Sequence, residues 1–206
     1  MAIRAILFDG DGVVQRPAPY AERLRKAFGA LPADSAALYE AIHAAEQPAL
    51  TGAARLSDLL PPILAAHGLA FDPARFFAGW HGMTPEPAVL ALVARLRAAS
   101  IWCAIASNQE AIRARFMSRT LGYHALFDRE YYSCDLGAAK PDPAFFRILL
   151  ADGRLDPATT LFIDDRAENV AVAARAGFVA VRFALPDDGG AGDLAALLAR
   201  FFDMSA

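Results

Sequence analysis

The sequence predicts an α/β protein with a doubly wound parallel sheet and an inserted α-helical cap. Three observations support this fold class. Short apolar runs without alternation recur along the chain, amphipathic helical stretches separate them, and about 70 residues after the first run contain no convincing strand. Unalternating apolar runs are typical of strands buried on both faces, as in parallel sheets. The alternation of such strands with helices indicates a layered α/β core.

The expected strands are short and mostly apolar, and several run directly into polar residues. We expect strands at residues 3–8, 101–106, 131–133, 160–163 and 179–183. The helical pattern covers residues 87–99, 110–121, 143–150, 167–176 and 194–202. In open α/β sheets, ligands bind beyond the carboxyl ends of the strands, so a functional site is expected there.

The segment between the first two expected strands interrupts this alternation. Its pattern indicates four helices punctuated by Gly and Pro, at residues 20–28, 35–45, 56–67 and 73–80. A connection between parallel strands needs far fewer residues. We therefore expect residues 15–84 to form a helical cap, and residues 1–14 and 85–206 to form the α/β catalytic core.

Local signals mark several helix starts and one turn. Asp-Pro-Ala occurs three times, which predicts an Asp N-cap followed by Pro at the first helical position, at Asp72, Asp142 and Asp156. The Asp-Asp-Gly-Gly segment at residues 187–190 is expected to form a turn before the last helix.

Composition and charge exclude several classes of protein. The 206 residues include 20 Lys and Arg against 23 Asp and Glu, a formal net charge of −3, which argues against a nucleic-acid binder. Two cysteines are too few for a disulfide framework and fit a reducing compartment. The first apolar run is too short for a signal peptide, and no membrane-length apolar stretch occurs. We expect a soluble, cytoplasmic protein.

Acidic residues follow two of the expected strands. Asp9 and Asp11 lie two positions apart, so their side chains start on the same face, and mutual repulsion is expected to raise the pKa of one of them unless a cation sits between them. Asp164 and Asp165 follow another strand. Four carboxylates that meet at sheet ends form a hard-oxygen site, which suits Mg²⁺ better than zinc.

Four segments, taken in order, resemble the motifs of the haloacid dehalogenase (HAD) superfamily. They are DGDGVV, IASNQ, GAAKPDPAFF and FIDDRAENV. The resemblance covers residues 1–14 and about 85–183, and it implies a Rossmann-like core with a C1-type helical cap. The segments IASNQ and FIDDRAENV are most similar to the small-molecule phosphatases of the superfamily, including sugar-phosphate phosphatases.

The resemblance implies a role for each motif residue. Asp9 would be the nucleophile that forms an aspartyl-phosphate. Asp11 would be the general acid that protonates the leaving alcohol and then the base that activates water. Ser107 and the backbone N–H of Asn108 would bind phosphate, and Lys140 would bridge the nucleophile and the phosphate. The implied cofactor is Mg²⁺, with ligands from Asp9, the backbone carbonyl of Asp11, Asp164 and Asp165.

Further expectations concern the surroundings of these residues. Asp165 is expected to bind the metal directly, with Asp164 supporting it, and Asn169 would orient groups around the site. Lys140 is one of only two lysines beside 18 arginines, which suggests that its chemistry is needed. Gly10 departs from the superfamily, which more often has a larger apolar residue there, and its flexibility is expected to loosen the nucleophile.

These features predict a Mg²⁺-dependent phosphatase that hydrolyses a small phosphate monoester. A phosphomutase on the same core and a non-catalytic binding protein with this fold are the alternatives that the motifs leave open. A 2-haloacid dehalogenase is disfavoured, because such enzymes lack the second aspartate of DGDGVV and the acidic pair. The expected partner is a small phosphorylated metabolite, not nucleic acid or membrane, and either a monomer or a homodimer fits.

Overall fold

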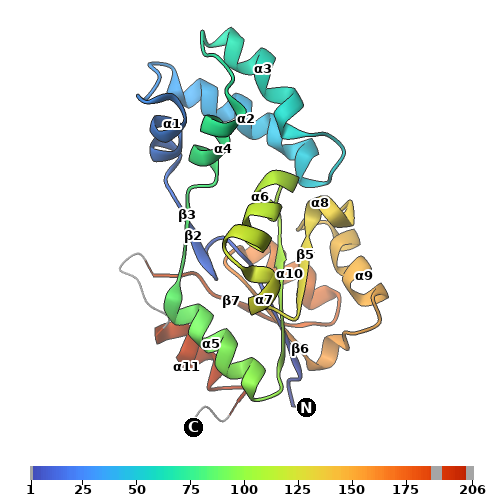
Figure 1. The fold of residues 1–206 in the computed structure, drawn as a ribbon. Coiled ribbons are helices and arrows are strands. Elements are labelled where there is room, and N and C mark those ends of the chain that lie inside the picture. Colours follow the sequence, from blue (N-terminus) through green and yellow to red (C-terminus); the bar gives the residue numbers. More distant parts are fainter. Residues whose placement is uncertain (1, 187–191, 203–206) are drawn as a thin grey trace.

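The computed structural model describes residues 2–186 and 192–202, and its central feature is a five-stranded parallel sheet (Figure 1). The strand order across the sheet is β5-β4-β1-β6-β7. The strands are β1 (Ala5–Phe8), β4 (Trp102–Ser107), β5 (Arg129–Tyr132), β6 (Thr160–Asp164) and β7 (Val179–Arg182). Each neighbouring pair is parallel, and β1 pairs with both β4 and β6. The predicted α/β fold is confirmed.

The middle strand shows why the apolar runs do not alternate. All four residues of β1 are buried, because apolar layers cover both faces of the sheet. Ile6 and Phe8 belong to the cluster on one face, whereas Ala5 and Leu7 belong to the cluster on the other. A polar side chain would be buried on either face, so this position in the sheet requires a continuous apolar run.

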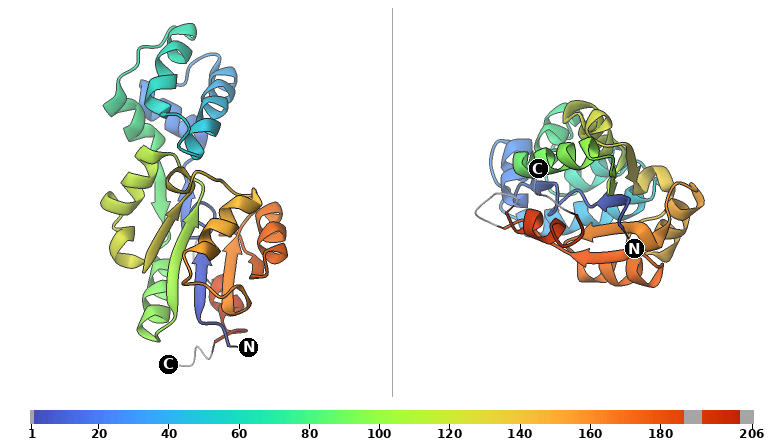
Figure 2. Two further views of the ribbon diagram at one scale, coloured as in Figure 1. Left: turned by 90° about the vertical axis from the view of Figure 1, so that its right-hand side faces the viewer. Right: turned by 90° about the horizontal axis from the view of Figure 1, so that it is seen from below.

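Helices supply the two apolar layers. On the Phe8 face, buried residues come from α5 (Pro87–Ala98), α7 (Tyr123–Leu126) and α11 (Gly192–Leu198). On the Leu7 face, they come from α9 (Pro143–Ala151) and α10 (Ala167–Arg175). Figure 2 shows the green helix α5 and the orange helices α9 and α10 on opposite sides of the strands.

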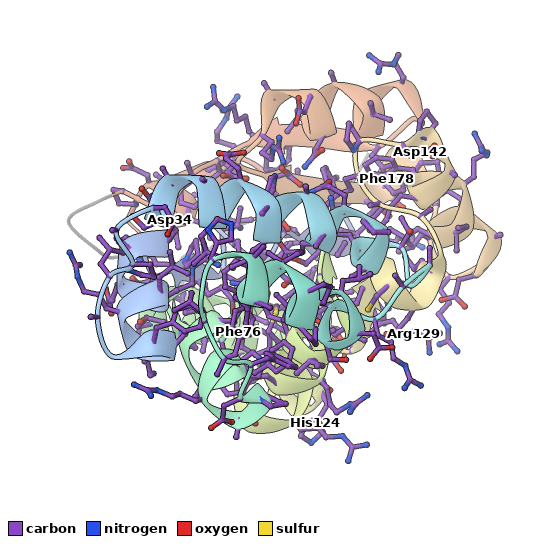
Figure 3. The ribbon with its side chains drawn as sticks, turned by 90° about the horizontal axis from the view of Figure 1, so that it is seen from above. Asp34, Phe76, His124, Arg129, Asp142 and Phe178 are labelled. Carbon is purple, nitrogen blue, oxygen red and sulfur yellow. The ribbon has the colours of Figure 1, made fainter. Side chains whose placement is uncertain are left out.

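Four helices lie above the carboxyl ends of the strands and share an apolar cluster of their own. They are α1 (Tyr20–Phe28), α2 (Ser35–Leu50), α3 (Leu56–Ala66) and α4 (Pro73–Trp80). Figure 3 looks down on them with Phe76 in their midst, where its ring stacks on Trp80 at 5.5 Å. All four expected cap helices form, and α2 continues to Leu50, five residues beyond its expected end.

The expectation that residues 15–85 contain no strand is wrong. β2 (Gln15–Pro17) and β3 (Met83–Pro85) form an antiparallel ribbon where the chain enters and leaves the helical segment. Arg16 reinforces the ribbon by pairing with Glu86 at 2.6 Å. Three-residue strands that contain proline show no local alternation, and their partners are distant in sequence, so the pattern did not reveal them.

Other differences from the expected elements concern short segments. The expected helix 110–121 divides into α6 (Ala111–Arg115) and a π-helical turn (Phe116–Thr120). The strand expected at residues 131–133 is β5, which ends at Tyr132, and the short helix α8 (Ser133–Leu136) begins at the next residue. A 3-10 turn (Pro157–Thr159) precedes β6. The expected turn at 187–190 lies outside the described residues.

The expected aspartate N-caps are present, and no membrane-spanning helix occurs among the described residues. The aspartates of the three Asp-Pro-Ala segments accept hydrogen bonds from backbone N–H groups of the following turn, which confirms them as N-caps: Asp72, Asp142 and Asp156. Within residues 2–186 and 192–202, the helices are too short or too polar to span a membrane.

We expect Phe146→Ala to lower the free energy of unfolding by about 3–5 kcal/mol. The Phe146 ring is fully buried and lies 5.2 Å from the ring of Phe162 and 5.5 Å from that of Phe145, so truncation leaves a cavity. The matched control on the same helix is Ile148→Ala, because Ile148 is 36% exposed and its truncation is expected to cost about 0.5 kcal/mol or less. Urea unfolding measures both, and similar losses for the two variants would contradict the described packing.

Candidate active site

The carboxyl ends of three adjacent strands bring the expected site residues together. Asp9 follows β1, Ser107 ends β4 and Asp164 ends β6. Because β1 lies between β4 and β6, these ends meet at one edge of the sheet. A cavity of about 170 Å³ opens there, lined by Asp9, Asp11, Ser107, Asn108, Lys140, Asp165, Arg166 and Asn169.

The Lys140 ammonium is the centre of this arrangement. Its Nζ lies 2.9 Å from Asp9 Oδ1 and 2.6 Å from Asp164 Oδ2, and it donates to the Ala106 carbonyl at 2.8 Å. All three N–H donors of the ammonium therefore have acceptors. Burial alone would lower the pKa of Lys140, but the charges of Asp9 and Asp164 raise it above its ordinary value. Lys140 is therefore a buried cation whose charged form is favoured by its two carboxylate neighbours.

Asn108 positions Lys140 through its side chain. Its Nδ2 donates to the Lys140 carbonyl at 2.7 Å, and its Oδ1 accepts from the Lys140 backbone N–H at 2.9 Å. This reciprocal pair fixes the loop that carries the ammonium. Sequence reasoning considered only the backbone N–H of Asn108, so this positioning contact was missed.

Asp9 is buried, and its pKa is raised to about 7. The largest cause is burial, the nearby Lys140 charge opposes it, and the charge of Asp164 adds to it. Asp11 contributes least. The expected rise in the pKa of one of the two aspartates is therefore present, but its largest cause is burial, and repulsion from Asp11 is only a small part of it.

Asp11 lines the same cavity, but its carboxylate is held by a different set of partners. Arg113 donates to both of its oxygens, at 2.6 and 3.1 Å, and Gln15 donates at 2.8 Å. Burial would raise the pKa of Asp11, yet Arg113 and these hydrogen bonds hold it below its ordinary value. Arg113 is a residue that sequence reasoning missed. Its position in the sequence could have indicated it, because Arg113 lies in the first turn of the helix that follows IASNQ and so starts beside the site.

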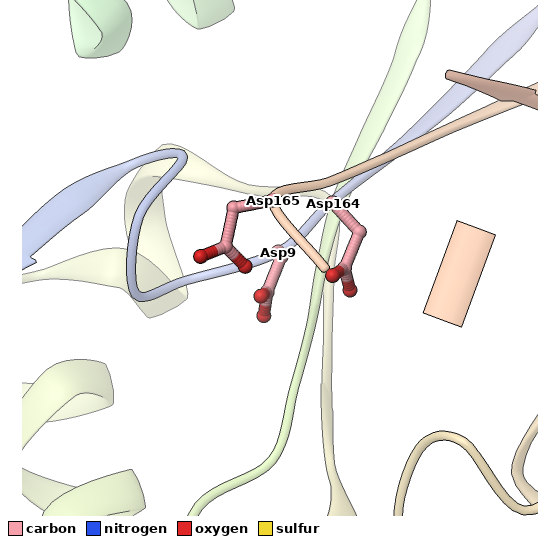
Figure 4. Close-up of side chains that lie close together, drawn as sticks. All are labelled: Asp9, Asp164 and Asp165. Atoms are coloured by element: carbon pink, nitrogen blue, oxygen red, sulfur yellow. The ribbon is translucent and has the colours of Figure 1, made fainter. Parts of the chain in front are cut away.

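The three remaining carboxylates form an acidic cluster. Ligand atoms of Asp9, Asp164 and Asp165 all lie within 4.8 Å of one another, and Figure 4 shows their side chains gathered at the ends of the strands. Asp164 is fully buried and accepts hydrogen bonds from Lys140 and Asn169, whereas Asp165 is partly exposed. The side chain of Asp11 stands outside this group.

This donor set fits a hard divalent cation. Three carboxylates gather around the Lys140 ammonium, and Arg166, which also lines the cavity, is paired with Glu168, so negative charge is in excess at the cluster. In addition, the buried Oδ1 of Asn169 accepts no hydrogen bond from the residues that the structure describes. Oxygen ligands and uncompensated negative charge are what Mg²⁺ sites provide.

Gly10 has a steric role at this site. A Cβ added at Gly10 would lie 2.7 Å from Ser107 Oγ and 3.2 Å from Met117, so glycine allows the hydroxyl to approach the loop after Asp9 closely. Gly12 has a positive φ of 83°, and a Cβ there would lie 2.7 Å from Asp165 Oδ2. Both glycines therefore leave room for the polar side chains that line the cavity.

We expect Asp9→Asn to stabilise the metal-free protein at about pH 8. The folded-state pKa of about 7 exceeds the ordinary value of 3.8, so between these values the folded state binds more protons and the free energy of unfolding falls as pH rises. The variant lacks this penalty. Its melting temperature in chelator should exceed that of wild type by a few degrees at about pH 8 and approach it near pH 4.

The control is Asp58→Asn, a substitution of an exposed carboxylate in α3. A difference in melting temperature between Asp9→Asn and wild type that stays constant over the whole pH range would contradict the described environment of Asp9.

Comparisons with known proteins agree with this fold. The haloacid dehalogenase-like hydrolase family matches residues 3–177. The chain is also similar to D-ribitol-5-phosphate phosphatase of Bacteroides thetaiotaomicron, with 37% identity over 51 residues. That match covers 25% of this chain and only 25% of the length of the relative.

Two solved structures share the fold over almost their whole length. A HAD-like family hydrolase from Porphyromonas gingivalis has a TM-score of 0.79 and 23% identity, covering 97% of this chain and 99% of that one. A HAD family enzyme from Bacteroides thetaiotaomicron, in complex with magnesium and inorganic phosphate, has a TM-score of 0.77 and 19% identity, covering 94% and 99%. Since the family match spans most of the chain, this protein belongs to the haloacid dehalogenase-like hydrolases.

Proposed function

We propose that this hydrolase is a Mg²⁺-dependent phosphatase that cleaves a small phosphate monoester through an aspartyl-phosphate on Asp9. The observation that carries the proposal is the position of Asp9, a buried carboxylate that contacts Lys140 and lines a small cavity with Ser107. Two of the similar proteins support it: one is a sugar-alcohol phosphate phosphatase, and one was solved with magnesium and phosphate.

Asp9 performs the first step in this proposal. Its carboxylate oxygen attacks phosphorus, the bond between phosphorus and the leaving oxygen breaks, and the leaving alcohol takes a proton. An anionic carboxylate approaches an anionic phosphate, so the Lys140 ammonium at 2.9 Å reduces their repulsion. The hydroxyl of Ser107 donates to a phosphate oxygen and holds the group in place.

The acidic cluster is the proposed cofactor site. Asp9, Asp164, Asp165 and the backbone carbonyl of Asp11 would hold Mg²⁺, with Asp165 as a direct ligand and Asp164 in support. When bound, the cation supplies positive charge that offsets the charge on the nucleophile and on the phosphate oxygens. Asn169 orients Asp164, since its amide donates to both oxygens of that carboxylate at 2.9 and 3.0 Å.

Asp11 is the proposed acid and base. In its described surroundings it is an ionised acceptor, which is the form that takes a proton from water in the second step. The proton that it gains there is the one available for the leaving alcohol of the next substrate. The small volume of the cavity favours a compact substrate, and the similarity to a ribitol phosphate phosphatase makes polyol and sugar phosphates the first candidates.

A panel of phosphate esters tests the proposed function. We expect Mg²⁺-dependent release of phosphate from sugar or polyol phosphates, and loss of at least about 10³-fold in kcat for Asp9→Asn, because that variant has no nucleophile. The measurement is phosphate release with Mg²⁺ and with chelator. No turnover of any ester, or equal turnover by Asp9→Asn, would favour a binding protein, and metal-independent halide release from chloroacetate would favour a dehalogenase.

We expect Lys140→Arg to lose about 10²–10³-fold in kcat. A planar guanidinium cannot place one compact charge against Asp9, Asp164 and a carbonyl oxygen at the same time. Lys26→Arg is the matched control, since Lys26 is the only other lysine and is exposed on α1. Turnover of Lys140→Arg at the wild-type rate would contradict the role of Lys140.

A further inference from the structure

Arg113 is a buried arginine in α6, and it makes the strongest contacts of the Asp11 carboxylate. It lies on the helix that follows β4 and is 6% exposed. Its Nη1 lies 2.6 Å from Asp11 Oδ2, and its Nη2 lies 3.1 Å from Asp11 Oδ1. A bidentate arginine–carboxylate pair fixes both the position and the plane of the carboxylate, whereas a single hydrogen bond does not.

The other partners of Asp11 are donors as well. Gln15 donates to Oδ1 at 2.8 Å, and Gln109 lies 3.4 Å from Oδ2. Both amides are themselves held, because Tyr123 donates its hydroxyl proton to Gln15 at 2.8 Å and Arg113 donates to Gln109 at 2.8 Å. Because all the described partners donate, they hold the carboxylate as an acceptor in a fixed orientation.

The backbone under Arg113 is fixed too. Glu110 is buried and caps α6, and its carboxylate accepts from the backbone N–H groups of Ile112 and Arg113 at 2.8 and 2.6 Å. The guanidinium therefore extends from an anchored first turn and not from a mobile loop. Such anchoring is what a residue needs if it is to hold a second side chain in a reactive orientation.

We propose that Arg113 is a positioning residue that holds Asp11 as the base for hydrolysis of the aspartyl-phosphate, an inference that rests on the proposed function. In that step a water oxygen bonds to phosphorus and the bond between phosphorus and the Asp9 oxygen breaks. Asp9 leaves as a carboxylate, inorganic phosphate is released, and the water proton goes to Asp11. The step needs the Asp11 carboxylate in a fixed orientation, which the two contacts with Arg113 supply.

The two chemical steps can be separated with p-nitrophenyl phosphate. Its leaving group departs without being protonated, so formation of the aspartyl-phosphate does not require Asp11, whereas hydrolysis does. Loss of Arg113 should therefore slow only the second step. In kinetic terms, kcat falls while kcat/KM, which reports the first step, is retained.

We expect Arg113→Met to lose about 10²-fold in kcat with p-nitrophenyl phosphate while kcat/KM changes by less than about 3-fold. Rapid mixing should show a burst of one p-nitrophenolate per active site, and mass spectrometry should find the phosphoryl group retained on the protein. Arg113→Lys keeps the charge but not the two-pronged geometry, so it should show the same pattern with a smaller loss in kcat.

The matched control is Arg115→Met, which removes an exposed arginine of the same helix and should behave as wild type. Parallel losses of kcat and kcat/KM in both Arg113 variants, with no burst, would overturn the role of Arg113 while leaving the phosphatase intact. A wild-type protein with no Mg²⁺-dependent turnover would instead contradict the proposed function itself.

Discussion

The contact of one ammonium with two buried carboxylates is the constraint on which the site depends. Lys140 Nζ joins Asp9 and Asp164, which end two adjacent strands, so it offsets charges that the sheet brings together. Replacing Lys140 by a neutral residue would leave two buried carboxylates without a counter-charge, which is costly. The clamp of Asn108 on the backbone of Lys140 follows from this, because the ammonium is useful only if its loop is fixed.

Even with this contact, the site keeps an excess of negative charge. One ammonium cannot balance three carboxylates, and the pKa of Asp9 remains raised to about 7 even with Lys140 beside it. The fold thus buries the Asp9 carboxylate where its charged form is disfavoured, which lowers stability and creates a preference for a cation. Such unfavourable placement is typical of functional sites, because a fully compensated cluster would have no remaining attraction for a metal or a substrate.

Sequence predicted the parts of this molecule that depend on local pattern. Unalternating apolar runs located the strands of the sheet, and the polar residues after them located Asp9, Ser107 and Asp164, because parallel strands end at a common edge. The ribbon of β2 and β3 was missed, since three-residue strands carry no period. The partner of Asp11 was missed for a related reason: Arg113 lies 102 positions later, and no local pattern encodes a contact at that separation.

The segment around helix α6 contacts both the helical cap and the Asp11 carboxylate of the site. Ile112 packs against the apolar cluster of the cap helices, and Phe116, just after α6, stacks on His81 at 4.4 Å, beside the ribbon that leads back from the cap. Between these two contacts, Arg113 holds Asp11. Because one short helix bears both sets of contacts, a shift of the cap against the core acts on the segment that orients Asp11. The Asp11 carboxylate is therefore positioned by the packing of the cap helices as well as by the sheet.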